Sequence, residues 1–120
     1  MKTLVEILAV LLLAAPVHAG TKSLFTAPAP VALFGGTGLT CFLLNVGKNP
    51  ITMTINVHDH FGTVTGTTSA SVAPGTTSGF NSASNTDQYC EFQVTGSTKT
   101  VRASALYFNS TGYTMSIPAQ

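Results

Sequence analysis

The sequence predicts an all-β protein, an antiparallel β-sandwich of about seven strands with one disulfide. Short stretches that alternate between apolar and polar residues recur between Gly, Pro and Asn clusters. Outside the first twenty residues, no stretch has the i, i+3, i+4 spacing of an amphipathic helix. Two cysteines, Cys41 and Cys90, lie within two of the expected strands. Many short strands separated by regular turns are typical of a two-sheet sandwich.

The composition fits one small globular domain and excludes several classes of partner. Hydrophobic residues make up 44% of the 120 residues and charged residues only 8%, against a usual charged share of roughly 25%. Disordered chains have the opposite balance. The net charge is +1, so we expect no nucleic-acid partner and no binding to an anionic membrane.

The N-terminus has the pattern of a secretory signal peptide. Lys2 precedes an apolar run, Ile7–Ala15, and the small residues of Pro16–Ala19 suit a signal peptidase. We expect cleavage between Ala19 and Gly20. The run is too short for a transmembrane helix, which needs about 20 apolar residues, and no later stretch is long enough. The predicted location is therefore secreted or periplasmic.

The chain divides into three expected parts. Residues 1–19 form the signal peptide, residues 20–30 an extended tether, and residues 31–120 a single β-sandwich domain. The tether is suggested by Ala27-Pro28-Ala29-Pro30, because alternating prolines favour an extended chain.

The strands follow in order along the third part. Tyr89–Val94 and Ile51–Val57 alternate most clearly, whereas Leu39–Val46 is apolar on both faces and suits a central or covered strand. Thr63–Ser69 is rich in threonine and is expected at a sheet edge. The remaining expected strands are Val31–Phe34, a short one within Ser78–Asp87, Lys99–Phe108 and Tyr113–Ile117. The predicted core consists of Leu43, Ile55, Val57, Phe92, Val94 and Val101.

Two turns have specific backbone requirements. Asp59–Gly62 is expected to be a hairpin loop with Gly62 at positive φ, and Pro74-Gly75 a turn of type II character.

The two cysteines are expected to form a disulfide, because an exported protein meets an oxidising compartment. They are 49 positions apart, and closing a loop of that size stabilises the fold by about 4 kcal/mol. A metal or catalytic role is the alternative, but no other Cys and no His is close to either in sequence.

Several spaced pieces carry a resemblance: Cys41-x-x-x-Asn45-Val46-Gly47, Asp59-x-x-Gly62, Pro74-Gly75, Tyr89-Cys90-x-Phe92-x-Val94 and Val101–Ser104. Together they resemble small secreted bacterial two-cysteine proteins of unknown function. More loosely, the chain is similar to fibronectin-type and immunoglobulin-like modules, although it lacks the Trp of true immunoglobulin domains. The resemblance implies an exported β-sandwich and brings no catalytic residues.

His58-Asp59-His60 is the one cluster that suggests a metal. If the strand continued through His60, both imidazoles would share an outward face and could chelate Cu(II), Ni(II) or Zn(II). A third ligand would have to come from Asp59, Asp87 or Glu91. We instead expect a polar hairpin end with solvated histidines and no cofactor.

Catalytic motifs are missing. No Ser or Thr lies in a Gly-x-Ser-x-Gly elbow, and His58 and His60 are the only candidate bases after the signal peptide. Gly35–Gly38 lacks the Lys and the helix of a phosphate loop and is expected to be a turn. The sequence therefore predicts no enzyme.

Some surface contacts can be anticipated. Arg102 should face outward, where it could pair with Glu91 on a neighbouring strand. The tyrosines Tyr89, Tyr107 and Tyr113 could form a sugar-stacking platform, but we expect them to pack on the sheets.

The sequence thus favours an exported, non-catalytic structural, adhesive or binding module. Its partner would be an unknown protein or glycan, and the chain itself a monomer or weak oligomer. The alternatives are a carbohydrate-binding module and a periplasmic copper or zinc handler that uses His58 and His60.

Overall fold

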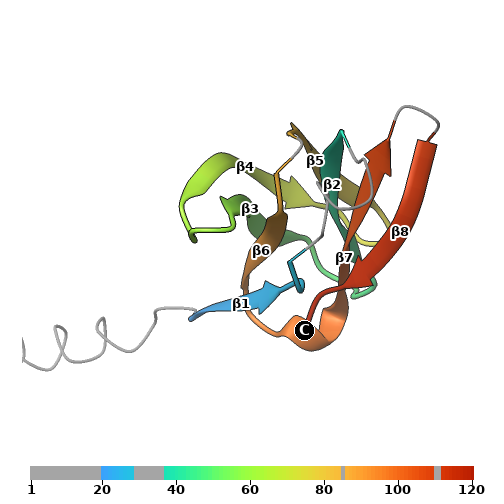
Figure 1. Cartoon of the computed structure of the whole chain (residues 1–120). Helices are drawn as coiled ribbons and strands as arrows, with labels where there is room; N and C mark the ends of the chain where they lie inside the picture. Colours follow the sequence, from blue (N-terminus) through green and yellow to red (C-terminus); the bar gives the residue numbers. More distant parts are fainter. Residues whose placement is uncertain (1–19, 29–36, 85, 110–111) are drawn as a thin grey trace, which may run out of the picture.

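The computed structural model describes residues 20–28, 37–84, 86–109 and 112–120, with the backbone alone at 113–115. The predicted signal peptide and the expected strand Val31–Phe34 lie outside these residues. Eight strands are present in the described part (Figure 1): β1 Thr21–Phe25, β2 Gly38–Asn45, β3 Ile51–Asp59, β4 Val64–Val72, β5 Thr77–Ala83, β6 Gln88–Thr95, β7 Val101–Asn109 and β8 Gly112–Pro118.

The strands form two antiparallel sheets of four, which confirms the predicted all-β, two-sheet architecture. The first sheet has the order β1-β6-β3-β4 and the second the order β5-β2-β7-β8. A 3-10 turn, Thr98–Thr100, precedes β7. No helix in the described ranges is both long and apolar enough to cross a membrane.

The core lies between the sheets and follows from the alternation of the strands. On β3 and β6 every second side chain is fully buried, and the intervening ones face outward. This is the period-two pattern that places one face of each strand against the other sheet. All six predicted core residues are buried: Leu43, Ile55, Val57, Phe92, Val94 and Val101.

The expectation of a tether over residues 20–30 is wrong for its first half. Residues Thr21–Phe25 form β1, which pairs with β6 and is a strand that the sequence did not predict. Only Leu24 packs against the core, so the segment carries almost no alternation of its own. Its strand conformation comes from the ladder with β6, a partner far away in the sequence.

Thr26 fixes the end of this added strand. Its side chain is buried, its Oγ1 accepts a hydrogen bond from Cys90 N at 3.0 Å, and its own N–H donates to Cys90 O at 3.0 Å. Both polar groups of a buried threonine are therefore satisfied, as burial requires.

The predicted disulfide is present and joins the two sheets. Cys41 lies on β2, between β5 and β7, and Cys90 lies on β6, between β1 and β3; their Cα atoms are 6.0 Å apart. The covalent link therefore connects an inner strand of each sheet.

One side of the sandwich is closed by the last two residues of the chain. Ala119 N donates to Ala103 O of β7 at 2.9 Å, and Gln120 exchanges two backbone hydrogen bonds of 2.9 Å with Phe25 of β1. The C-terminus lies beside β1 as a result (Figure 1). On the opposite side, β4 pairs with β3 alone and β5 with β2 alone among the described strands.

The two predicted turns are confirmed. Gly62 has φ +83° and Gly75 has φ +74°, the left-handed region that glycine enters without strain. Thr76 N donates to Ala73 O at 3.1 Å across Pro74-Gly75, the hydrogen bond of a type II turn.

Candidate functional site

The outward face of the β1-β6-β3-β4 sheet carries a polar cluster centred on Glu91. Glu91 lies on β6 between the inward residues Cys90 and Phe92, so the alternation of the strand places its side chain outside. Its neighbours come from β1 and β3, which flank β6. The Glu91 side chain is nevertheless only 13% exposed, because the surrounding side chains cover it.

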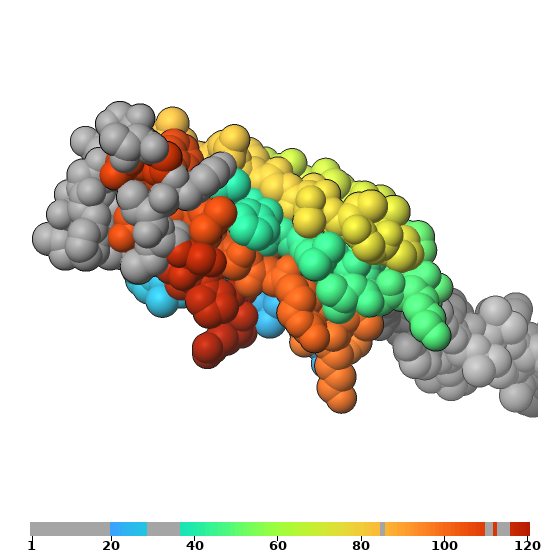
Figure 2. Space-filling model, turned by 90° about the vertical axis from the view of Figure 1, so that its right-hand side faces the viewer, coloured from blue at the N-terminus to red at the C-terminus, as the bar shows by residue number. Residues whose placement is uncertain are grey.

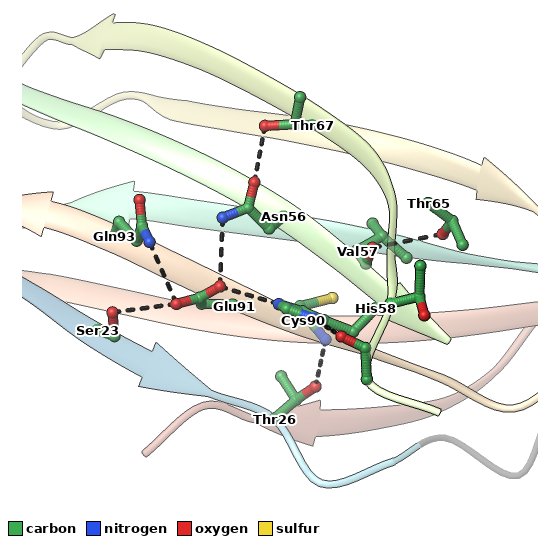
Figure 3. Close-up of polar contacts among 12 residues, drawn as sticks. Ser23, Thr26, Asn56, Val57, His58, Thr65, Thr67, Cys90, Glu91 and Gln93 are labelled. Carbon is green, nitrogen blue, oxygen red and sulfur yellow. Dashed lines mark hydrogen bonds and ion pairs between the residues drawn. The ribbon is translucent and has the colours of Figure 1, made fainter. Parts of the chain in front are cut away.

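Four side chains donate hydrogen bonds to the Glu91 carboxylate (Figure 3). His58 Nε2 lies 2.9 Å and Asn56 Nδ2 3.2 Å from Oε1. Ser23 Oγ and Gln93 Nε2 each lie 3.2 Å from Oε2. Glu91 thus joins three strands through its side chain.

The hydrogen bonds decide the charge of this carboxylate. Burial by itself raises the pKa of Glu91, but the four donors outweigh it and lower the pKa below the ordinary value of 4.5. Donors that favour the charged form act in this direction. Glu91 is therefore ionised at neutral pH and acts as an acceptor, not as a proton donor.

His58 lies between two oxygen acceptors. Its Nε2 faces Glu91 Oε1 at 2.9 Å, and its Nδ1 faces Gly62 O at 3.0 Å. A neutral imidazole donates from one nitrogen only, whereas the imidazolium donates from both. The charged form of His58 therefore satisfies both contacts at once. Tyr89 stacks on the ring with centroids 4.7 Å apart and planes 2° from parallel.

The loop after β3 is held by Asp59. Its Oδ1 accepts hydrogen bonds from Phe61 N and Thr63 N, both at 2.9 Å. This side-chain turn ends the strand. The Gly62 carbonyl is thereby held within hydrogen-bond distance of Nδ1 of His58.

The structure does not place the two histidines as a chelating pair. The strand ends at Asp59, so His60 leaves the outward row, and its ring packs on Phe61 with centroids 3.9 Å apart. Both nitrogens of His58 already have partners. Within the described ranges, no three His, Cys, Asp or Glu residues gather as a metal site would require.

The cluster also lacks the geometry of a catalytic triad. Ser23 donates directly to Oε2 of Glu91, while His58 contacts Oε1. In a triad the imidazole lies between the hydroxyl and the acid, so that it can take the hydroxyl proton. Here the acid lies between the two, and the arrangement serves to position side chains.

The expected pairing of Arg102 with Glu91 is wrong. Arg102 lies on β7 of the second sheet, and its Nη1 donates to Lys99 O at 3.2 Å and to Val101 O at 2.9 Å. Glu91 lies on the first sheet. The sequence correctly places both side chains outward but does not reveal that they belong to different sheets.

The tyrosines do not gather on one surface. Tyr107 is buried between the sheets at 2% exposure, as expected for sheet packing, and Tyr89 stacks on His58 at the opposite outer face. The side chain of Tyr113 lies outside the described residues. The first part of Gly35–Gly38 also lies outside them, and Gly38 begins β2.

Sequence reasoning missed the pairing of His58 with Glu91. The outward positions of both residues follow from the alternation of β3 and β6, but their proximity depends on register: His58 is opposite Tyr89, and Asn56 is opposite Glu91. A histidine and a glutamate at outward positions of two clearly alternating strands were the available signal.

Comparisons with known proteins identify no relative: the chain matches no family model, no curated protein and no solved structure. The two-cysteine all-β fold that the resemblance implied is present. The comparisons do not support the chain's membership of a group of secreted proteins or its likeness to immunoglobulin-type modules.

Proposed function

We propose that the chain is an exported, non-catalytic binding module, which recognises a protein partner by adding a strand of that partner to its own sheet edge. The observation that carries this proposal is the composition of the edge strand β4. Its nine residues, VTGTTSASV, include no charged residue and no proline.

Natural sandwiches normally protect such an edge with lysines, prolines, bulges or short strands. The β1 edge follows this rule, because it carries Lys22 and its end is paired with Gln120. No charged residue or histidine occurs anywhere from Phe61 to Thr86, a segment that includes both β4 and β5. Export, inferred from the predicted signal peptide and the disulfide, would bring this edge into contact with extracytoplasmic partners.

Strand addition requires unpaired backbone groups, which β4 offers along its outer side. β4 pairs with β3 from Val72 to Val64, and its one bulge is at Thr65, between the pairs Val57–Gly66 and His58–Val64. The stretch from Gly66 to Val72 is regular. Among the described strands none pairs with its other side. A partner strand there would gain main-chain hydrogen bonds, and alternate side chains would supply specificity.

The proposal is tested with charges on the edge. The variant Ser69→Lys/Ser71→Lys adds two lysines to outward positions of β4, and Thr52→Lys adds one to the same face on the inner strand β3, directly opposite Ser71. Proteins captured by the full-length product from its own exported fraction should be lost with the β4 variant and retained with the β3 control.

Hydrogen exchange distinguishes strand addition from other binding. The captured partner should slow amide exchange along β4 by at least tenfold, because a new ladder protects its free N–H groups. The proposal would be contradicted if the β4 lysine variant still captured the same partners, or if a captured partner did not slow amide exchange in β4.

The structure favours neither alternative function by a specific observation. A tyrosine platform for sugars is not formed by Tyr89 and Tyr107, and His58 already uses both ring nitrogens.

A further inference from the structure

The outward face of the β5-β2-β7-β8 sheet is apolar at its centre. Phe42 and Leu44 on β2 and Leu106 on β7 occupy outward positions, because their neighbours in sequence face the core. The described residues leave all three only partly buried. The outer face of the other sheet instead carries serine, threonine, asparagine and glutamate. An apolar patch on the solvent side of a sandwich marks a binding surface.

A groove follows β7 from Val101 to Ser104, and it is lined both by the outward residues Phe42 and Leu44 and by Leu24 of β1, which packs against the core. It has a volume of about 530 Å³, within the range of roughly 300–1,000 Å³ for small-molecule sites. Most of its walls are apolar, and they include Leu24, Phe42, Leu44, Val101, Ala103 and Pro118. Figure 2 looks onto this side of the molecule, where blue atoms of β1 are visible between the red C-terminal residues and the orange segment around β7.

A cation lies at the groove. Arg102 lines it and is exposed, and its Nη1 is held by the carbonyls of Lys99 and Val101. These two bonds leave the Nε and Nη2 N–H groups of the guanidinium to a ligand. Lys99 is exposed three positions before Arg102.

No acid opposes this charge in the groove. The acidic residues of the described chain are Asp59, Asp87 and Glu91, and none of them lines it. The groove therefore combines apolar walls with a positive end and has no acidic side chain in its lining. This complements a molecule with an apolar chain and an anionic head.

We propose that the groove binds a free medium-chain alkyl carboxylate, with its hydrocarbon chain along Phe42 and Leu44 and its carboxylate on Arg102. A guanidinium pairs with a carboxylate through two parallel hydrogen bonds, which fixes the orientation of the ligand. The volume lies in the lower half of the range for small-molecule sites, which suits one acyl chain better than a two-chain lipid. This site is independent of the proposed strand addition at β4.

Calorimetric titration of the full-length product with octanoate, decanoate and dodecanoate, below their micellar concentrations, tests the site. One saturable site is expected, and its affinity should rise about fourfold per added methylene, the factor for burying one CH₂. Decanol should bind at least tenfold more weakly than decanoate, because it lacks the charge.

Variants assign the two halves of the groove. Arg102→Ala should weaken decanoate binding at least tenfold and leave the affinity for decanol unchanged. Lys48→Ala, which removes a surface cation away from the groove, is the matched control. Ser104→Trp, at the position opposite Phe42, should abolish binding of both ligands by filling the groove. Circular dichroism confirms that each variant is folded, and the lysine variant of β4 should bind decanoate normally.

Four results would overturn the proposal. In the first, decanoate does not saturate a single site in the calorimetric titration. In the second, Arg102→Ala binds decanoate as well as the parent does. In the third, the changes in amide NMR chemical shift on titration spread over the whole protein, as they would with a surfactant. Binding to vesicles of anionic phospholipid without binding of free decanoate would likewise reject a free carboxylate as the ligand.

Discussion

The Nε2 atom of His58 lies 2.9 Å from Oε1 of Glu91, and this contact links two neighbouring strands on the outer face of the sandwich. Both side chains are 13% exposed, so solvent and salt weaken this contact less than one between fully exposed side chains. The other ring nitrogen of His58 contacts the Gly62 carbonyl, which extends the link to the loop after β3.

Acid should weaken the fold through Glu91. Because its pKa in the folded protein is below the ordinary 4.5, its contribution to the free energy of unfolding is complete above about pH 4.5 and is lost as the pH falls through the lowered value. Urea denaturation of the parent and of Glu91→Gln from pH 7 to pH 2.5 measures this. The variant should be less stable at pH 7 and lose less stability in acid; equal slopes for the two would refute the assignment.

Replacing His58 by Phe keeps a ring against Tyr89 but removes both hydrogen bonds. We expect a loss of roughly 1–3 kcal/mol at neutral pH, because a partly buried carboxylate loses a donor. Amides of the loop 60–63 should also exchange faster. The matched control is His60→Phe, which alters an exposed ring and should change the free energy of unfolding by less than about 0.5 kcal/mol. Two equally stable variants would show that the contacts of His58 carry no stability.

Asn45 should be among the most sensitive polar positions. It is fully buried; its Nδ2 donates to Asn49 O and Val72 O, and its Oδ1 accepts from Gly47 N, all at 2.8–2.9 Å. Asn45→Ala leaves these three backbone groups without their partner, which should cost roughly 3 kcal/mol. Thermal denaturation compares it with Asn81→Ala, an exposed asparagine that should change the stability by less than about 0.5 kcal/mol.

Loss of the disulfide should cost about 4 kcal/mol by the chain-entropy model, because Cys41 and Cys90 close a loop of 49 positions. Urea denaturation of the Cys41→Ala/Cys90→Ala protein measures the loss, and the parent in reducing buffer provides the second measurement. Because the bond lies between inner strands of the two sheets, the variant should also lose cooperativity. A parent that melts identically with and without reductant would show that the sheets hold without the bond.

The local alternation of apolar and polar residues was sufficient to predict which side chains are buried wherever one face of a strand packs against the core. The burial of Met53, Ile55 and Val57 follows from period-two alternation, since a strand with one apolar face can be buried in only one way. The turns at Gly62 and Gly75 could equally be predicted, because they require a residue at positive φ, which glycine adopts without strain. The strand β1 could not be predicted from the sequence, because a single core-facing apolar residue, Leu24, does not establish an alternating pattern.

The sequence by itself determined the all-β class, the strand faces, the turns and the disulfide pair, because each depends on residues close together or on there being two cysteines. Only the tertiary structure decided which strands are neighbours, and it put Glu91 beside His58 instead of Arg102. The edge position of β4 confirms what its threonine-rich sequence predicted. The tertiary structure also gathered Leu24, Phe42 and Arg102 around one groove. Strand order and register are set by contacts between residues far apart in the chain, which local alternation does not encode.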